Sequence, residues 1–134
     1  NITDGRYVYM RSGRKADGCL NNYTVVPLHM FHPFSVEELA KTQRELTDEF
    51  EFTKGVPVMK IPAKGSTSPD NTCYQFEEHM KYGDLLFDLE EDGEQRSPIK
   101  DAALEQKMIE AMRQLMAENE APEELYKRIG VSPV

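Results

Sequence analysis

The stretch YGDLLFDLEEDGE, residues 82–94, contains the strongest strand signal in the chain. Its centre, LLFDL at residues 85–89, is rich in strand-forming residues and follows the turn-forming residues Gly83 and Asp84. The acidic residues that follow predict a turn. Asp88 interrupts the apolar run, and we interpret it as a strand-end residue whose carboxylate hydrogen bonds to this turn.

A second strand is predicted at YVYM, residues 7–10, which lies between a turn at Asp4-Gly5 and a second one at Ser12-Gly13. Residues 22–28 predict a further extended segment. The short apolar stretches at 50–52 and 56–61 are broken by glycine and proline, which is typical of edge strands or loops. Residues 63–72 predict a turn-rich excursion with no core residues.

Two regions predict helices. Ser35 is a good N-cap with Glu38 three residues later, which together form a capping box, and this first helix is expected to run to about Leu46. The last helical region is expected to open at Ser97-Pro98, because proline suits the first turn of a helix. One apolar stripe at helical spacing follows it: Leu104, Met108, Ala111, Met112 and Leu115.

The chain is expected to end in a short helix over residues 123–129, which Gly130 stops. Together the elements predict an α+β fold class: a small, mostly antiparallel β-sheet with helices packed on one face, ending in a C-terminal helix. The length of 134 residues suits one domain, residues 1–134, since domains commonly contain about 100–200 residues.

The formal net charge of −8 is unevenly distributed. Residues 77–134 contain fifteen acidic and seven basic residues, whereas residues 1–30 contain four basic and two acidic ones. An acidic chain repels a phosphate backbone, so we expect no nucleic-acid partner. No apolar run in the sequence is long enough to span a bilayer, so no membrane span is predicted.

The sequence offers no self-sufficient catalytic motif. It contains neither a Gly-x-Ser-x-Gly elbow nor a glycine-rich phosphate loop. Cys19 and Cys73 form no CxxC pair, and either a disulfide or two buried thiols is consistent with their spacing. We therefore predict no catalytic residue and no metal ligand in this chain.

Four residues are the best candidates for contact with a substrate. Arg11 and Arg14 suit an anion because guanidinium groups match the geometry of oxyanions, although a solvated strand end is an equal alternative. His29 and His32 precede Pro33, which favours an extended backbone rather than a helical metal-binding pair. Two roles remain for these histidines: ordinary packing, or a contribution to a substrate pocket.

The order of several segments resembles the C-terminal subdomain of bacterial formylglycine-dependent sulfatases, in the alkaline-phosphatase-like superfamily. DGRYVYMR, residues 4–11, resembles the first strand of that subdomain, and GDLLFDLEED, residues 83–92, resembles its "LYDLxxDPxE" strand and turn. Gly93 replaces the usual proline of that turn. Weaker similarities lie at residues 23–30, 52–60, 95–99, 119–122 and 128–131.

This resemblance implies that the chain is part of a longer protein whose catalytic domain lies N-terminal to it. Such a domain would supply the formylglycine, made from a Cys or Ser in a C/S-x-P-x-R motif that this chain lacks, and a bound calcium ion. The C-terminal part would be inactive alone, would pack on the catalytic domain and would help to wall the substrate cleft. The implied substrate is a sulfate ester, and the group of bacterial sulfatases that the chain resembles suggests a carbohydrate sulfate.

The resemblance also implies a periplasmic or secreted protein. The alternatives are a fragment of a related phosphodiesterase or phosphonate hydrolase, and a free-standing interaction module. A fragment with an orphaned interface would self-associate, whereas an independent module would be a monodisperse protein.

Overall fold

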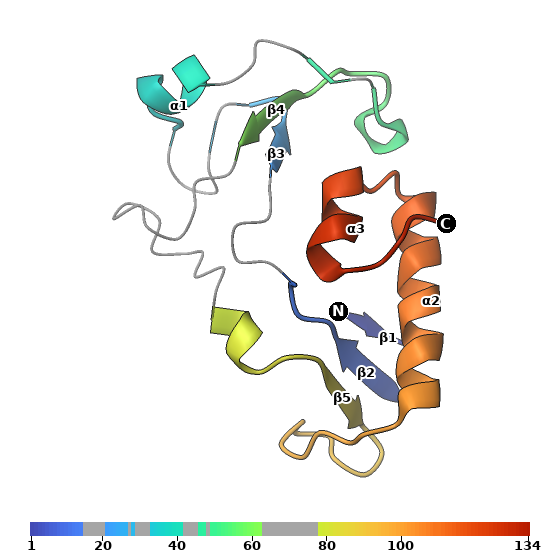
Figure 1. Cartoon of the computed structure of the whole chain (residues 1–134). Helices are drawn as coiled ribbons and strands as arrows, with labels where there is room; N and C mark the ends of the chain where they lie inside the picture. The colour runs from blue at the N-terminus through green and yellow to red at the C-terminus, as the bar shows by residue number, and fades with distance from the viewer. Residues whose placement is uncertain (15–20, 27, 29–32, 42–45, 48, 63–77) are drawn as a thin grey trace.

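The computed structural model describes residues 1–14, 21–26, 28, 33–41, 46–47, 49–62 and 78–134, and the account below concerns these residues. A three-stranded antiparallel sheet contains β1 (Ile2–Thr3), β2 (Tyr7–Met10) and β5 (Leu85–Asp88), in the order β1-β2-β5 (Figure 1). The register sets Tyr9 opposite Leu86. Both strands predicted most firmly from sequence are therefore confirmed, and they are neighbours.

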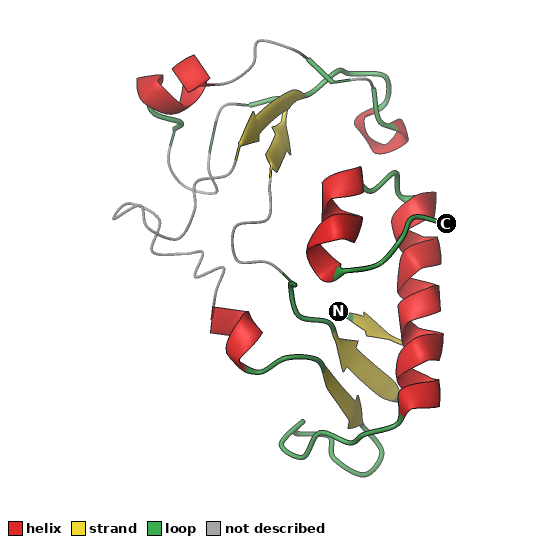
Figure 2. Ribbon diagram, viewed as in Figure 1, coloured by secondary structure: helices red, strands yellow, loops and turns green. Residues whose placement is uncertain are grey.

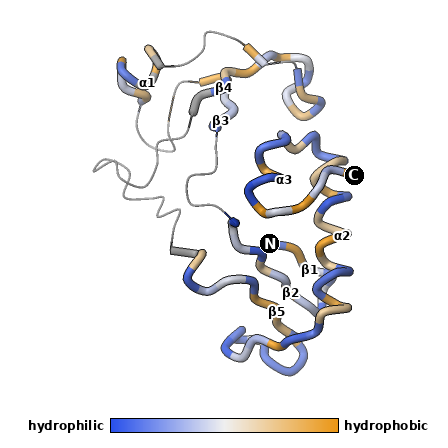
Figure 3. Tube along the Cα trace, viewed as in Figure 1, coloured by the Kyte–Doolittle hydropathy of each residue, from blue (hydrophilic) through white to orange (hydrophobic). Residues whose placement is uncertain are grey.

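The long helix α2 (Ala102–Glu118) packs against this sheet. Tyr9 and Leu86 face it from β2 and β5, and together with Met108 and Met112 they form the buried cluster of the core. Figure 3 shows apolar residues along β5 and mainly polar ones in the turn that follows it. Met108 and Met112 of the predicted apolar stripe thus lie on the core-facing side of α2, whereas Leu115 at its C-terminal end is 50% exposed.

The start of α2 differs from the prediction. Asp101 is the N-cap, and its carboxylate accepts a hydrogen bond from the backbone N–H of Leu104 at 3.0 Å. Ile99 instead extends the sheet, because its N–H donates to the carbonyl of Leu86 at 2.8 Å. Pro98 therefore precedes the helix and does not lie in its first turn, so this part of the prediction was wrong.

The last helix, α3 (Glu123–Ile129), has the predicted bounds. Gly130 adopts the left-handed conformation with φ 67°, and its N–H donates to the carbonyl of Lys127. The N–H of Val131 donates to the carbonyl of Tyr126 at 3.0 Å, which completes a Schellman-type end. Beyond it, Arg113 on α2 donates to the carbonyls of Ser132 and Pro133, which holds the tail of the chain along α2.

Residues 21–62, which we call the arm, contain a second sheet. Here β3 (Asn21–Thr24) and β4 (Met59–Pro62) pair antiparallel, with α1 (Val36–Lys41) and a short 3-10 helix, η1 (Glu51–Thr53), between them in sequence (Figure 2). The strand β3 thus starts one residue before the predicted extended segment 22–28 and ends within it, at Thr24. Another 3-10 helix, η2 (Glu78–Lys81), precedes β5.

The first helix is also shorter than predicted. Leu46 forms an isolated antiparallel bridge with Met59, so it belongs to the arm's sheet and not to a helix that continues from Ser35. Pairing with an existing strand satisfies backbone groups that the last turn of a helix would leave open. The predicted end at Leu46 was therefore wrong.

The fold class is α+β, as predicted, with antiparallel strand pairing, α2 on one face of the three-stranded sheet and a helix at the C-terminal end. The strands divide into two small sheets, which the sequence did not indicate. Across the described ranges, every helix is too short or too polar to cross a bilayer.

Candidate functional site

Asp84, immediately before β5, is the centre of a polar cluster at the end of the three-stranded sheet. One carboxylate oxygen, Oδ2, accepts hydrogen bonds from the Tyr9 hydroxyl at 3.0 Å and from Arg14 Nη2 at 2.6 Å. The other, Oδ1, accepts from the backbone N–H of Ser12 at 2.9 Å and from Arg14 Nη1 at 3.1 Å. Arg14 therefore binds this carboxylate in the two-pronged geometry that strengthens such pairs.

Arg11 connects the same cluster to the end of α3. Its Nη1 lies 3.4 Å from Asp84 Oδ2, and its Nε and Nη2 donate to the carbonyls of Ile129 at 2.7 Å and Gly130 at 3.2 Å. The backbone N–H of Arg14 adds a bond of 2.7 Å to the carbonyl of Arg128. The segment after β2 is thus fastened both to Asp84 and to the last carbonyls of α3, whose partial negative charge suits a cation.

The electrostatics of the cluster favour its charged form. Burial alone would raise the pKa of Asp84, but hydrogen bonds from Arg14, Ser12 and Tyr9 outweigh it, and the pKa lies below its usual range. The hydrogen bond to Asp84 in turn raises the pKa of Arg14. Asp84 is therefore a carboxylate at neutral pH and forms a bidentate ion pair with Arg14.

Two predicted substrate-contact residues, Arg11 and Arg14, are thus brought together, and Asp84 is the anion that they hold. The Arg11 side chain is 10% exposed, whereas that of Arg14 is 41% exposed. Any role for them toward a sulfate stays a prediction, and Arg14 is the more accessible of the two. His29 and His32 lie outside the described residues, as do Cys19 and Cys73.

A second carboxylate cluster closes the other end of the β2–β5 pair. Arg6 Nε and Nη2 donate to Asp88, the latter at 2.7 Å, and Arg6 Nη1 lies 2.9 Å from Glu90. The backbone N–H of Glu90 donates to Asp88 Oδ1 at 3.1 Å, so the interpretation of Asp88 as a strand-end residue that bonds the following turn is confirmed. The hydrogen bonds from Arg6 lower the pKa of Asp88.

A third cluster connects the arm to α3. Glu124 Oε1 accepts hydrogen bonds from Asn21 Nδ2 at 2.8 Å and from the Tyr23 hydroxyl, and it lies 3.6 Å from Lys60 Nζ. Burial alone would raise the pKa of Glu124, but the hydrogen bonds from Tyr23 and Asn21 bring it below its usual range. Burial and the bond to Glu124 raise the pKa of Tyr23, so its hydroxyl stays protonated and donates.

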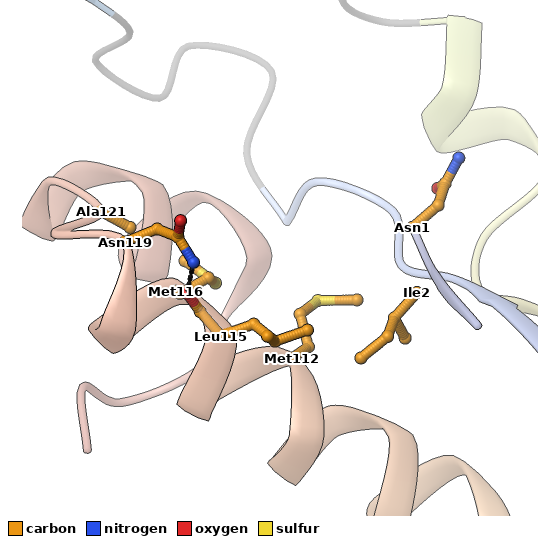
Figure 4. A pocket seen from close by; sticks show the side chains of 7 residues that line it. All are labelled: Asn1, Ile2, Met112, Leu115, Met116, Asn119 and Ala121. Carbon is orange, nitrogen blue, oxygen red and sulfur yellow. Dashed lines mark hydrogen bonds between the residues drawn. The ribbon is translucent and has the colours of Figure 1, made fainter. Parts of the chain in front are cut away.

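A shallow apolar hollow lies between β1 and the C-terminal half of α2 (Figure 4). Its volume is about 250 Å³. It is lined by seven residues, none with a titratable side chain: Asn1, Ile2, Met112, Leu115, Met116, Asn119 and Ala121. The Asn119 amide donates to the Leu115 carbonyl at 2.7 Å. Such a lining suits contact with apolar groups.

No triple of His, Cys, Asp or Glu side chains is gathered for a metal ion in the part of the chain that the structure describes. Among the described residues, the charged clusters are therefore ion pairs that hold one element against another. Sequence reasoning missed the two central carboxylates, Asp84 and Glu124. Asp84 looked like a turn residue, and Glu124 like one of the acidic residues common in the first turn of a helix.

Comparison of the chain with protein-family models, curated proteins and solved structures finds no match.

Proposed function

We propose that this chain is the C-terminal, non-catalytic part of a sulfatase, which packs on the catalytic domain and helps to wall the cleft for a sulfated substrate. The observation that carries the proposal is the pairing of the two most specific resembling segments, residues 4–11 and 83–92. They are far apart in sequence and adjacent in the sheet. Each end of the pair is closed by an ion pair between the segments, Arg6 with Asp88 and Arg11 with Asp84.

In this proposal the intact protein is a sulfuric ester hydrolase, and its formylglycine and calcium ion belong to the catalytic domain. They would supply the nucleophile and the charge stabilisation for attack on sulfur. This chain supplies shape to the cleft. The proposed wall residues are His29 and His32, then Arg14 and Arg11. Leu28 and Pro33, which flank these histidines in sequence, form an isolated antiparallel bridge.

The arm supports the idea of a partner surface. Large apolar side chains on it are exposed: Val25, Val26, Leu28, Val36, Leu39, Leu46, Phe52 and Val56. All eight belong to the stretch 21–62, and we propose a protein interface as the role of these exposed side chains. The partner proposed here is the catalytic domain of the same polypeptide, and self-association of the isolated chain is the expected substitute.

The substrate class, a carbohydrate sulfate, and a periplasmic or extracellular location rest on the resemblance alone. The test is an activity assay of the full protein that contains this chain, with an aryl sulfate and the matching aryl phosphate. Preferential hydrolysis of the sulfate, abolished when the Cys or Ser of a C/S-x-P-x-R motif is replaced by Ala, is the expected result. Preference for the phosphate ester would favour the related phosphodiesterase instead.

The isolated chain gives a second test. Sedimentation velocity of residues 1–134 is expected to show self-association. An activity assay of the same chain is expected to show no hydrolysis of the aryl sulfate or the aryl phosphate. A stable monomer encoded as a complete protein would contradict the proposal and favour an independent interaction module.

A further inference from the structure

The attachment of the arm to α3 converges on one atom. Asn21 and Tyr23 are two residues apart on β3, so their side chains lie on the same face of the arm's sheet. Lys60 is the cross-strand partner of Tyr23 and shares that face. All three side chains reach Oε1 of Glu124, in the first turn of α3. One carboxylate oxygen therefore contacts both strands of the arm.

Neighbouring contacts also restrict the orientation of the arm at this attachment. Lys60 Nζ also lies 5.6 Å from the centre of the Tyr23 ring, and the Phe50 ring meets Tyr23 edge-on at 5.6 Å. The carboxylate of Glu120 accepts a hydrogen bond from the backbone N–H of Glu51. Glu124 thus lies against a fixed aromatic and cationic surface, with a second bond close by.

The other end of α3 is fixed to the three-stranded sheet, since Arg11 holds the carbonyls of Ile129 and Gly130. The helix therefore spans two attachments, Glu124 to the arm at its start and Arg11 to the sheet at its end. Figure 1 shows α3 between the two sheets. Because α3 is short and is held at both ends, it fixes the position of one sheet relative to the other.

We infer that Glu124 is a positioning residue, whose carboxylate sets where the arm's sheet, β3 and β4, sits relative to the three-stranded sheet. The consequence for a substrate rests on the proposed function, which assigns His29 and His32, in the arm's stretch of sequence, to the cleft wall. In the sulfatase, loss of this carboxylate would displace part of the cleft wall while the catalytic domain stays intact. Substrate binding would then suffer more than turnover.

The first experiment measures placement without any substrate. Spin labels carried by non-natural residues at Val36 on α1 and Gln106 on α2, both exposed, report the distance between arm and core in the full protein. Glu124→Ala is expected to broaden the distance distribution at least twofold. Glu124→Gln, which keeps an acceptor for Tyr23 and Asn21, should fall between Ala and wild type. Tyr23→Phe, which removes one hydroxyl, should give a smaller change.

Glu123→Ala is the matched control. Glu123 also lies in the first turn of α3, but it pairs with Lys127 on the same helix, and both side chains are exposed. Its distribution should equal that of wild type. An unchanged distribution in Glu124→Ala, or equal broadening in Glu123→Ala, would overturn the inference.

The second experiment separates positioning from chemistry. In the full protein, Glu124→Ala is expected to raise KM for a carbohydrate sulfate about five- to tenfold and to change kcat less than twofold. A fall in kcat with KM unchanged would overturn the positioning role. Absence of sulfatase activity in the wild type would count against the proposed function, and the distance measurement would still decide the inference about Glu124.

Discussion

The core and the arm are stabilised by different interactions. In the core, β2, β5 and α2 enclose Tyr9, Leu86, Met108 and Met112. In the arm, Phe34 and Val58 are the large apolar side chains buried among the described residues, while eight others are exposed. Polar contacts at Glu124 fasten the arm to α3. The core buries its own apolar surface, whereas the arm leaves large apolar side chains exposed, and the proposed function assigns these to a partner.

The largest expected effect comes from the core. Leu86→Ala should lower the free energy of unfolding by about 2–5 kcal/mol, because loss of the buried side chain leaves a cavity between β5 and α2. Leu46→Ala is the matched change in the arm, where that side chain is 63% exposed. Its effect should stay within about 0.5 kcal/mol. Urea unfolding of both variants measures the contrast, and equal losses would contradict it.

The next effect comes from the Asp84 cluster. Asp84→Asn should cost about 2 kcal/mol, because it leaves Arg11 and Arg14 without their carboxylate partner. Glu94→Gln, which affects an exposed pair with Arg96, is the control and should produce no measurable change. Chemical unfolding at pH 7 checks both. A loss in Asp84→Asn no greater than in the control would show that the cluster does not stabilise the fold.

The same cluster predicts a pH dependence. The folded pKa of Asp84 lies below its usual value, so the contribution of the carboxylate is present above about pH 4 and is lost as pH falls through the folded pKa. The stability difference between wild type and Asp84→Asn should therefore shrink on acidification. Guanidinium unfolding of both proteins at pH 7 and at successively lower pH measures this. A difference that grows toward acid pH would have the wrong sign.

A pair of glycine variants isolates the contact between α3 and Arg14. Gly83 and Gly130 both have positive φ, of 66° and 67°, so either change to Ala should cost about 1 kcal/mol. A Cβ at Gly130 would also lie 2.6 Å from Arg14 Cγ, whereas one at Gly83 meets nothing within 4 Å. Gly130→Ala should therefore be the more destabilising in thermal unfolding. Equal losses of stability in the two variants would mean that the Arg14 side chain moves away from the new Cβ with no cost in free energy.

The smallest expected effect on stability comes from the arm's surface. Phe52 is 67% exposed and stacks on Phe50 at 5.2 Å between ring centres. Phe52→Ser should leave the unfolding free energy of the isolated chain nearly unchanged but reduce its self-association. Sedimentation velocity over a range of concentrations checks this, and unchanged association would remove Phe52 from the proposed interface.

Local sequence signals predicted the elements whose ends depend on nearby residues. Strand-forming runs between turn residues located β2 and β5, and Gly130 marked the end of α3. The errors occurred where a distant strand competed for the backbone. Leu46 pairs with Met59 and Ile99 with Leu86, and a helix pattern read from neighbours contains no information about those partners.

The candidate site shows the same limit. The positive charge and position of Arg11 and Arg14 were evident in the sequence, but their partner Asp84 lies about seventy residues further along the chain. Glu124 gathers residues from both strands of the arm and resembled any acidic residue at a helix start. The pairing of whole elements determines which carboxylate binds several partners, so spacing in the sequence could not identify it.

The strand order β1-β2-β5 has a consequence for how the protein is made. Because β2 pairs with β5 and the core needs α2, the ribosome must complete residues 85–118 before the β2–β5 pair and the core can form. Long-range pairing of this kind slows folding. The arm emerges earlier than Glu124, its attachment point, so its apolar side chains are exposed during synthesis. In the proposed sulfatase, a catalytic domain folded earlier in synthesis would be the first surface available to the arm.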